Sequence, residues 1–210
     1  MKFERIESVI FPELKEYNIE LIENVIVSNK EQLEKALDII NLPCYGKIIA
    51  REDLHKSDKG LVREINTLNE CIAFYEELKN LNKEKNVYSF VLQKRVKGVE
   101  LFLGMKKDNL FGHVLLFGFG GIFVEVYRDI SYGILPVSKD DFLEMIEDTK
   151  IGRSLLNGYR GYGIDFDKLY DLVKNTYKLL REKNYSEIEY NPIIVSKDGI
   201  TSIVDVKIIK

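Results

Sequence analysis

The last two strand-forming segments of this 210-residue chain are joined by a turn that fixes how they pair. The run Ser196-Lys-Asp-Gly-Ile200 is typical of a three-residue hairpin loop with its glycine in the left-handed conformation. Counting outward from that turn places Asn191 opposite Asp205 and Glu189 opposite Lys207. Residues two apart along a strand share a face, so we expect all four side chains on one side of the hairpin.

An amide and a carboxylate held side by side in this way suit a hard divalent cation. Directly opposed Cβ atoms lie about 4.5–5.5 Å apart, so oxygens of both side chains reach one ion. Magnesium prefers oxygen ligands and takes one or two from protein and the others from phosphates. Asn191 and Asp205 are therefore candidate magnesium ligands. The same pattern also fits polar residues on the solvent face of an edge hairpin, because strand alternation often produces such faces.

Helix and strand signals alternate along the rest of the chain. Apolar stripes at helical spacing predict four helices: two follow capping boxes at Ser28–Glu31 and Thr67–Glu70, one opens at Ser138 with Asp141, and one spans Asp167 to about Lys183. Runs of β-branched and aromatic residues predict strands at Tyr45–Ile49, Val87–Val91, Val99–Met105, Val114–Phe117, Ile188–Val195 and Ile200–Ile209. This interleaving, with many hairpin-like neighbours, predicts an α+β protein with largely antiparallel sheets.

Composition narrows the class of partner. The chain is 45% hydrophobic and 31% charged, as is ordinary for a globular protein, and its formal charge of −3 provides no basic field for nucleic acid. No apolar run approaches the length of a membrane span, and the N-terminus lacks the features of a signal peptide. Cys44 and Cys71 have no motif spacing. We expect a cytoplasmic protein with reduced cysteines and with neither nucleic acid nor membrane as a partner.

Four further motifs resemble those of one family. They are Lys47-Ile-Ile-Ala-Arg-Glu-Asp-Leu-His-Lys-Ser-Asp58, Leu116-Phe-Gly-Phe-Gly-Gly-Ile-Phe-Val-Glu-Val126, Leu155-Leu-Asn-Gly-Tyr-Arg-Gly161 and Glu189-Tyr-Asn-Pro192. Together they resemble the β subunit of ADP-forming acetyl-CoA synthetases, which belong to the ATP-grasp superfamily and are related to the succinyl-CoA synthetase β subunit. The resemblance runs from about Leu14 to Ile208. It implies that residues 1–210 form one ATP-grasp domain, with two α+β lobes of mixed or antiparallel sheets around a nucleotide cleft. The order of the predicted elements places the crossover between the lobes near residues 85–93.

The resemblance also implies roles for residues in the first half of the chain. Lys47 matches a lysine that contacts nucleotide phosphates, and a strand-borne ammonium suits that task. His55 matches the histidine of the His-Lys-Ser-Asp motif, which carries a phosphoryl group between subunits; a neutral imidazole is nucleophilic near pH 7. Without the family context, the favoured interpretation is that Lys47 is a surface lysine and His55 a loop histidine.

Further roles concern the hinge and the terminal hairpin. The hinge backbone at about Gln93, Lys94 and Val96 would pair with adenine, and Glu100 would accept a ribose hydroxyl. Asn191 and Asp205 match the magnesium ligands of the family, in agreement with the hairpin geometry, and Glu189 would help to order the cation or His55.

Three other features of the motifs leave alternatives open. The glycines Gly118, Gly120 and Gly121 form either a phosphate-binding loop or, since they lack the spacing of common phosphate motifs, a tight turn near the active site or subunit contact. Arg160 could bind a phosphate in bidentate fashion or form a structural ion pair. Glu125 matches a family position whose role the sequence does not indicate.

The sequence departs from the family pattern at four places. Leu61 replaces a second glycine after the His-Lys-Ser-Asp motif, Lys94 replaces glutamate in the hinge, Pro43–Gly46 differs before Lys47, and Gly133 lies where an arginine is common. These departures suggest a divergent member with altered acyl or nucleotide preference, or one with reduced activity.

The function that we expect is phosphoryl transfer between His55 and the terminal phosphate of ADP or ATP with Mg²⁺, as part of an ADP-forming acetate–CoA ligase. The chain has no dinucleotide-type glycine motif that could hold CoA, which implies a separate CoA-binding α subunit in a hetero-oligomer. Three alternatives stay open: a degenerate ATP-grasp homologue that binds nucleotide or the α subunit without catalysis, a ligase that forms an acyl phosphate directly, and a scaffold domain that does not bind Mg-ATP.

Overall fold

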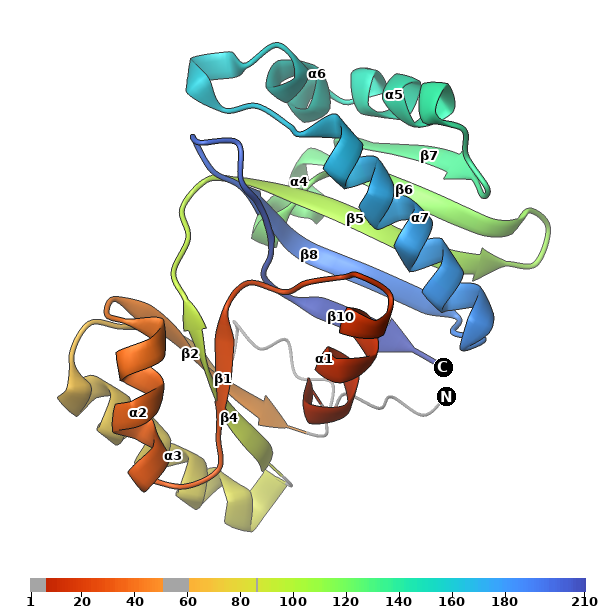
Figure 1. Cartoon of the computed structure of the whole chain (residues 1–210). Helices are drawn as coiled ribbons and strands as arrows, with labels where there is room; N and C mark the ends of the chain where they lie inside the picture. Colours follow the sequence, from red (N-terminus) through yellow and green to blue (C-terminus); the bar gives the residue numbers. More distant parts are fainter. Residues whose placement is uncertain (1–6, 51–60, 86) are drawn as a thin grey trace. The chain divides into compact units, whose positions relative to one another are not determined.

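The computed structural model describes residues 7–50, 61–85 and 87–210, and the chain divides into two compact units (Figure 1). We call residues 7–11 and 22–95 the N-terminal unit, and residues 12–21 and 96–210 the C-terminal unit. The residues expected to cross between lobes lie largely in the last strand of the N-terminal unit, and the C-terminal unit resumes at Val96. Among the described residues, no helix is both long enough and apolar enough to cross a membrane.

The N-terminal unit is a four-stranded antiparallel sheet with two helices. In spatial order its strands are β1 (Asn24–Val27), β4 (Val87–Lys94), β2 (Cys44–Ala50) and β3 (Val62–Ile65), and its helices are α2 (Glu31–Ile40) and α3 (Leu68–Lys85). Both helices pack on one face of the sheet, because the buried side chains of α2 and α3 form one cluster with those of alternate strand positions. At the centre of this cluster a Cβ on Gly46 would lie 2.9 Å from the Phe74 ring, so glycine lets the ring of α3 pack directly on β2.

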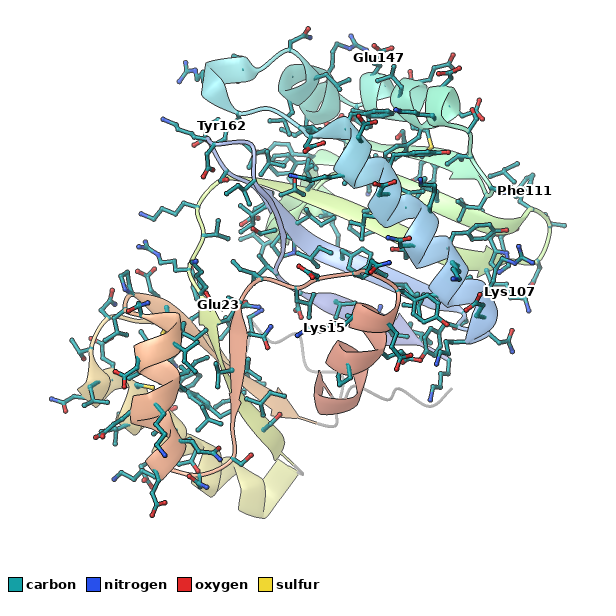
Figure 2. The ribbon with its side chains drawn as sticks, in the orientation of Figure 1. Lys15, Glu23, Lys107, Phe111, Glu147 and Tyr162 are labelled. Carbon is teal, nitrogen blue, oxygen red and sulfur yellow. The ribbon has the colours of Figure 1, made fainter. Side chains whose placement is uncertain are left out.

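The C-terminal unit is built on a six-stranded antiparallel sheet. Its strands are β10 (Val206–Ile209), β8 (Glu187–Val195), β5 (Val99–Asp108), β6 (Gly112–Phe119) and β7 (Ile130–Ile134) in spatial order, with β9 (Thr201–Ile203) also paired to β8. Its helices are the end of α1 (Glu7–Glu16), α4 (Val124–Tyr127), α5 (Lys139–Asp148), α6 (Lys150–Leu156) and α7 (Phe166–Glu182), with short 3-10 turns η1 (Gly121–Phe123) and η2 (Tyr159–Gly161). Helix α7 crosses one face of the sheet (Figure 1). Figure 2 shows Phe111 at the tip of the β5–β6 hairpin, where its side chain is exposed.

Side chains at the helix ends explain where several helices begin. Ser138 and Asp141 form a complete capping box at the start of α5, as predicted. Thr149 accepts a hydrogen bond from the N–H of Gly152 and so starts α6, which sequence periodicity missed because the helix has only seven residues. The cap predicted at Ser28 is wrong: Asn29 accepts from the N–H of Gln32, and the Gln32 side chain accepts from the N–H of Ser28.

The predicted register of the terminal hairpin is confirmed. Lys207 pairs with Glu189, and at the turn the N–H of Ser196 donates to the carbonyl of Ile200 over 3.0 Å. Gly199 has a φ of 77°, the left-handed conformation that the loop requires. The α+β class and the antiparallel pairing of the sheets are confirmed as well.

The hairpin differs from prediction at one point. The strand expected at Ile200–Ile209 is divided into β9 and β10 at Val204 and Asp205. Opposite this break β8 carries a bulge, because Leu101 pairs with Ile193 while Leu103 pairs with Tyr190. Two residues of β8, Asn191 and Pro192, therefore face a single residue of β5, an arrangement that redirects side chains and is common beside functional sites.

Candidate functional site

The face of the β8–β10 hairpin turned away from α7 carries polar and charged side chains. On the other face, Tyr190 is fully buried and its hydroxyl lies 2.9 Å from that of Thr176 on α7. Since strand residues alternate, Glu187, Glu189 and Asn191 point away from α7. All three are partly buried.

Asn191 and Asp205 lie opposite each other across this hairpin. The N–H of Asn191 donates to the Asp205 carbonyl over 3.3 Å, and this bond continues the register of the paired strands on either side. Asp205 Oδ1 accepts from the N–H of Val206 over 3.1 Å. An amide oxygen and a carboxylate opposite each other form an oxygen donor set that fits Mg²⁺ shared with phosphates.

A cationic side chain, Lys207, lies on the same hairpin, two residue pairs farther from the turn. Lys207 Nζ lies 3.0 Å from Glu187 Oε1 and 3.9 Å from Glu189 Oε2. This contact confirms that Glu189 and Lys207 share a face. The Lys207 ammonium offsets part of the negative charge that the two glutamates bring to the face.

The glycine-rich turn after β6 meets the hairpin at Asn191. The N–H of Gly121 donates a 2.7 Å hydrogen bond to Asn191 Oδ1. Glu100 lies beside the same turn, because a Cβ on Gly121 would be 1.6 Å from Glu100 Oε2. Of the two interpretations of these glycines, the structure agrees with a tight turn near the candidate site. Sequence reasoning left this contact unidentified, since it joins residues 70 positions apart.

In the N-terminal unit, Lys47 and Gln93 share the sheet face opposite α2 and α3. Lys47 pairs with Val91 and Tyr45 pairs with Gln93, so the two side chains lie on neighbouring strands as diagonal neighbours. Both residues are buried, with 7% and 3% of their surface exposed. A buried lysine on a rigid strand is suited to contact a phosphate.

The hinge side chains form local ion pairs. Lys94 Nζ lies 3.5 Å from Glu23 Oε2, and the Lys94 N–H donates to the Glu23 carbonyl over 2.9 Å. The N–H of Lys94 is thus already bonded to the residue before β1, so adenine pairing by this hinge would use other backbone groups. Arg95 follows with an ion pair of 3.2 Å to Glu64. Lys94, which replaces the glutamate of the family pattern, therefore has its positive charge paired with the Glu23 carboxylate.

Candidate residues therefore gather in two groups. Asn191, Asp205, Glu189 and Glu100 lie in the C-terminal unit with Val96, and Lys47, Gln93 and Lys94 lie in the N-terminal unit. His55 and the rest of the His-Lys-Ser-Asp motif lie outside the described residues.

Two departures from the family pattern have a packing explanation. Leu61 is 7% exposed and belongs to the apolar cluster under α2 and α3, so its side chain fills the core of the N-terminal unit. At Gly133 a Cβ would lie 2.5 Å from the sulfur of Met145, so the space that an arginine side chain would enter is occupied from α5.

Arg160 is exposed and has a left-handed backbone, with a φ of 54°. Its guanidinium lies 5.4 Å from the ring of its neighbour Tyr159. Within the part of the chain that the structure describes, no carboxylate forms an ion pair with it, which does not support the structural ion pair considered from the sequence. Glu125 is exposed on the short helix α4.

Comparison with known proteins gives a consistent result. Residues 10–209 match the profile of the family described as ATP-grasp domain. The chain is 31% identical over 208 residues to Acetate–CoA ligase (ADP-forming) I subunit beta of Pyrococcus furiosus, covering 93% of this chain and 89% of that subunit. It is 33% identical over 205 residues to Acetate–CoA ligase (ADP-forming) I of Archaeoglobus fulgidus, covering 94% of this chain and 30% of that ligase. The chain spans 27% of the second Archaeoglobus fulgidus ligase, so it corresponds to less than a third of these longer relatives.

Solved structures agree with the predicted ATP-grasp fold. PH1788 from Pyrococcus horikoshii Ot3 has a TM-score of 0.86 and 28% identity, covering 99% of this chain and 92% of that one. The dinucleotide-forming acetyl-coenzyme A synthetase 1 of Ca. Korarchaeum cryptofilum, in complex with coenzyme A and Mg-AMPPCP, has a TM-score of 0.74 and 29% identity, covering 93% and 87% of the two chains. The predicted fold is thereby confirmed.

Proposed function

Since the chain belongs to the ATP-grasp family, and within it to the group of ADP-forming acetate–CoA ligase β subunits, we propose that it is the nucleotide-binding subunit of an ADP-forming acyl-CoA synthetase. In this proposal it binds ATP or ADP with Mg²⁺ and passes a phosphoryl group between the nucleotide and His55. The complete ligase reaction would require a CoA-binding α subunit, since the similar Pyrococcus furiosus chain is named as a β subunit.

The observation that carries the proposal is the opposition of Asn191 and Asp205 across the terminal hairpin. These two residues would hold Mg²⁺ through an amide oxygen and a carboxylate oxygen. When bound, the cation would offset the negative charge of the nucleotide phosphates. The Korarchaeum relative supports binding of a magnesium nucleotide by this fold, since it was obtained with Mg-AMPPCP.

Residues of the N-terminal unit would hold the nucleotide. Lys47 would contact a phosphate, and the hinge from Gln93 to Val96 would face the adenine. Glu100 in the C-terminal unit would accept a ribose hydroxyl. Catalysis in this scheme consists mostly of positioning and electrostatic stabilisation, as is general for phosphoryl transfer.

The chemical step would use His55 as nucleophile. In the direction that consumes ATP, a nitrogen of its neutral imidazole would attack the γ-phosphorus. The bond from that phosphorus to the bridging oxygen would break, and ADP would leave with the bonding electrons. Glu189 would orient the imidazole. The Korarchaeum relative supports a histidine step, because it was solved with a phosphohistidine segment pointing towards its nucleotide-binding site.

A phosphoenzyme assay tests the proposal. The chain is incubated with Mg-ATP radiolabelled at the γ-phosphate, with and without a CoA-binding α subunit, CoA and short carboxylic acids. We expect acid-labile label on the chain with release of ADP, complete loss of the label in His55→Asn, and formation of acyl-CoA only when the α subunit is present. His113→Asn is the matched control, because His113 packs against Tyr177 on α7 and has no place in the scheme.

The outcomes separate the proposal from its alternatives. Nucleotide binding without label in the wild type would identify a degenerate homologue. Acyl phosphate formation that persists in His55→Asn without an α subunit would identify a direct ligase. A chain whose Tm does not rise with Mg-ATP would be a scaffold, and the proposal would be wrong.

A further inference from the structure

Gly121 contacts two candidate ligand-binding residues at once. Its N–H donates to Asn191 Oδ1 over 2.7 Å, and a Cβ on it would lie 1.6 Å from Glu100 Oε2. Gly121 also has a φ of 74°, in the left-handed region where residues with a Cβ are strained. The backbone conformation therefore favours glycine at this position, and a Cβ here would displace the Glu100 carboxylate.

The hydrogen bond from Gly121 fixes the direction of the Asn191 amide. A side-chain amide has an accepting oxygen at one end and two donating N–H groups at the other. The backbone N–H is only a donor, so only Oδ1 can face it. This oxygen has a second lone pair, and it is the end of the amide that a magnesium ion accepts.

We infer that Gly121 is a positioning residue for Asn191. Its N–H holds the amide oxygen in the orientation that a cation needs and keeps the amide nitrogen away from the cation. The inference rests on the proposed function, in which Asn191 is a metal ligand. Groups that hydrogen-bond to a metal ligand without touching the metal often have a large effect on metal affinity.

The turn that carries Gly121 is itself held by the sheet. The N–H of Gly120 donates to the Glu100 carbonyl over 2.8 Å, and a Cβ on Gly120 would lie 2.4 Å from the backbone of Leu101. A Cβ on Gly118 would lie 2.0 Å from the carbonyl oxygen of Asp129. The turn is thus fixed by close backbone contacts with β5 and with the segment before β7, so the Gly121 N–H is a rigid reference for Asn191.

The test compares Gly121→Ala with Gly158→Ala. Gly158 also has a positive φ, 69°, but a Cβ there would meet nothing within 4 Å, so this variant has a similar backbone strain without a clash. The probe is Mn²⁺ with ADP, because Mn²⁺ accepts the same oxygen ligands as Mg²⁺ and its binding is measurable by electron paramagnetic resonance. We expect Gly121→Ala to weaken Mn²⁺ binding by roughly 10- to 100-fold, and Gly158→Ala to leave it within about twofold of the wild type.

A double-mutant cycle separates positioning from general damage. If Gly121 acts through Asn191, Gly121→Ala adds little to the loss already caused by Asn191→Ala. Additive losses in the cycle, or an equal loss in Gly158→Ala, would overturn the inference. If wild-type chain binds Mn²⁺ with ADP and Gly121→Ala binds equally well, only this inference fails. If the wild type binds neither, the proposed function fails and the inference fails with it.

A second measurement does not depend on the folding of Gly121→Ala. In the ligand-free protein, amide hydrogen exchange of Gly121 is followed by nuclear magnetic resonance in the wild type and in Asn191→Ala. We expect faster exchange of this one amide in the variant, with little change at Gly158. Equal exchange rates at Gly121 would show that the amide of Asn191 is not held by this bond.

Discussion

Tyr190 and Thr176 join strand β8 to helix α7 through hydroxyl groups 2.9 Å apart, in a part of the core where both residues are fully buried. Burial raises the pKa of the Tyr190 phenol, so this hydroxyl is protonated at neutral pH. Tyr190 precedes Asn191 in the chain and points to the opposite face. The buried hydrogen bond therefore anchors the strand directly behind the candidate metal ligand.

Loss of this bond should destabilise the protein. In Tyr190→Phe the Thr176 hydroxyl is left buried without its partner, and we expect the free energy of unfolding to fall by about 1–2 kcal/mol. Thr176→Val should give a similar fall, and the double variant should lose less than the sum, because it leaves no orphaned hydroxyl. Urea denaturation of the four proteins measures this coupling, and additive losses would show that the two hydroxyls contribute independently.

The carboxylate of Asp205 should matter for metal binding more than other carboxylates on its face. Asp205→Asn keeps the size of the side chain but removes its charge, so we expect a smaller rise in Tm on addition of Mg-ATP and a higher Mg²⁺ requirement. Glu187→Gln is the matched control, since Glu187 lies on the same face and is paired with Lys207 over 3.0 Å. We expect the control to keep the Mg-ATP response. If Glu187→Gln reduced the rise in Tm as much as Asp205→Asn, the overall charge of this face would explain the effect, and Asp205 would not be a specific ligand.

Lys47 should contribute to nucleotide affinity through its charge. Hydrogen bonds to charged groups are worth about 1.5–3 kcal/mol, so Lys47→Met should weaken ATP binding by roughly 10- to 100-fold. Lys30→Met serves as control, because Lys30 is an exposed lysine of the same unit whose Nζ lies 3.9 Å from Glu76. Isothermal titration of ATP with Mg²⁺ measures both variants. An affinity of Lys47→Met equal to that of the control would remove Lys47 from the nucleotide site.

Local signals made much of the fold predictable from the sequence. The left-handed Gly199 sets the hairpin register, and alternation then places Glu189 and Lys207 on one face without further information. The capping box at Ser138 predicts α5 because both of its hydrogen bonds join residues three apart. Such features need only neighbouring residues, so pattern reasoning finds them.

Other features depend on contacts that no local pattern encodes. The break at Val204 lies opposite the bulge at Asn191 and Pro192, and one strand alone does not reveal it. The bond from Gly121 to Asn191 joins the turn after β6 to strand β8, so the glycines could be assigned to a turn but not to the residue that the turn holds. The start of α2 shows a third limit: Ser28 and Asn29 are adjacent and both of a residue type that favours caps, and the sequence does not indicate that Asn29 accepts the hydrogen bond.

The two cysteines should be unreactive while the protein is folded. Cys44 and Cys71 are both fully buried in the N-terminal unit, and burial raises the pKa of Cys44 to about 11 and that of Cys71 to about 12, with the Cys44 thiol adding to the latter shift. Only the thiolate is nucleophilic, so at pH 8 we expect alkylation by iodoacetamide to be more than about a hundredfold slower in the native protein than in denaturant. Mass spectrometry of labelled peptides measures both rates, and rapid labelling of the native protein would contradict this burial.

The same shifts make stability fall at alkaline pH. Both pKa values are higher in the folded protein than the ordinary value of 9.0, so the unfolded chain loses its thiol protons first as the pH rises. The stabilisation from the buried thiols is therefore complete below pH 9.0 and is lost progressively as the pH rises towards the folded values of about 11 and about 12. We expect the double variant Cys44→Ala, Cys71→Ala to have a flatter decline in its free energy of unfolding above pH 9.0 than the wild type. Parallel declines of the two proteins in urea denaturation would show that other groups cause the alkaline loss.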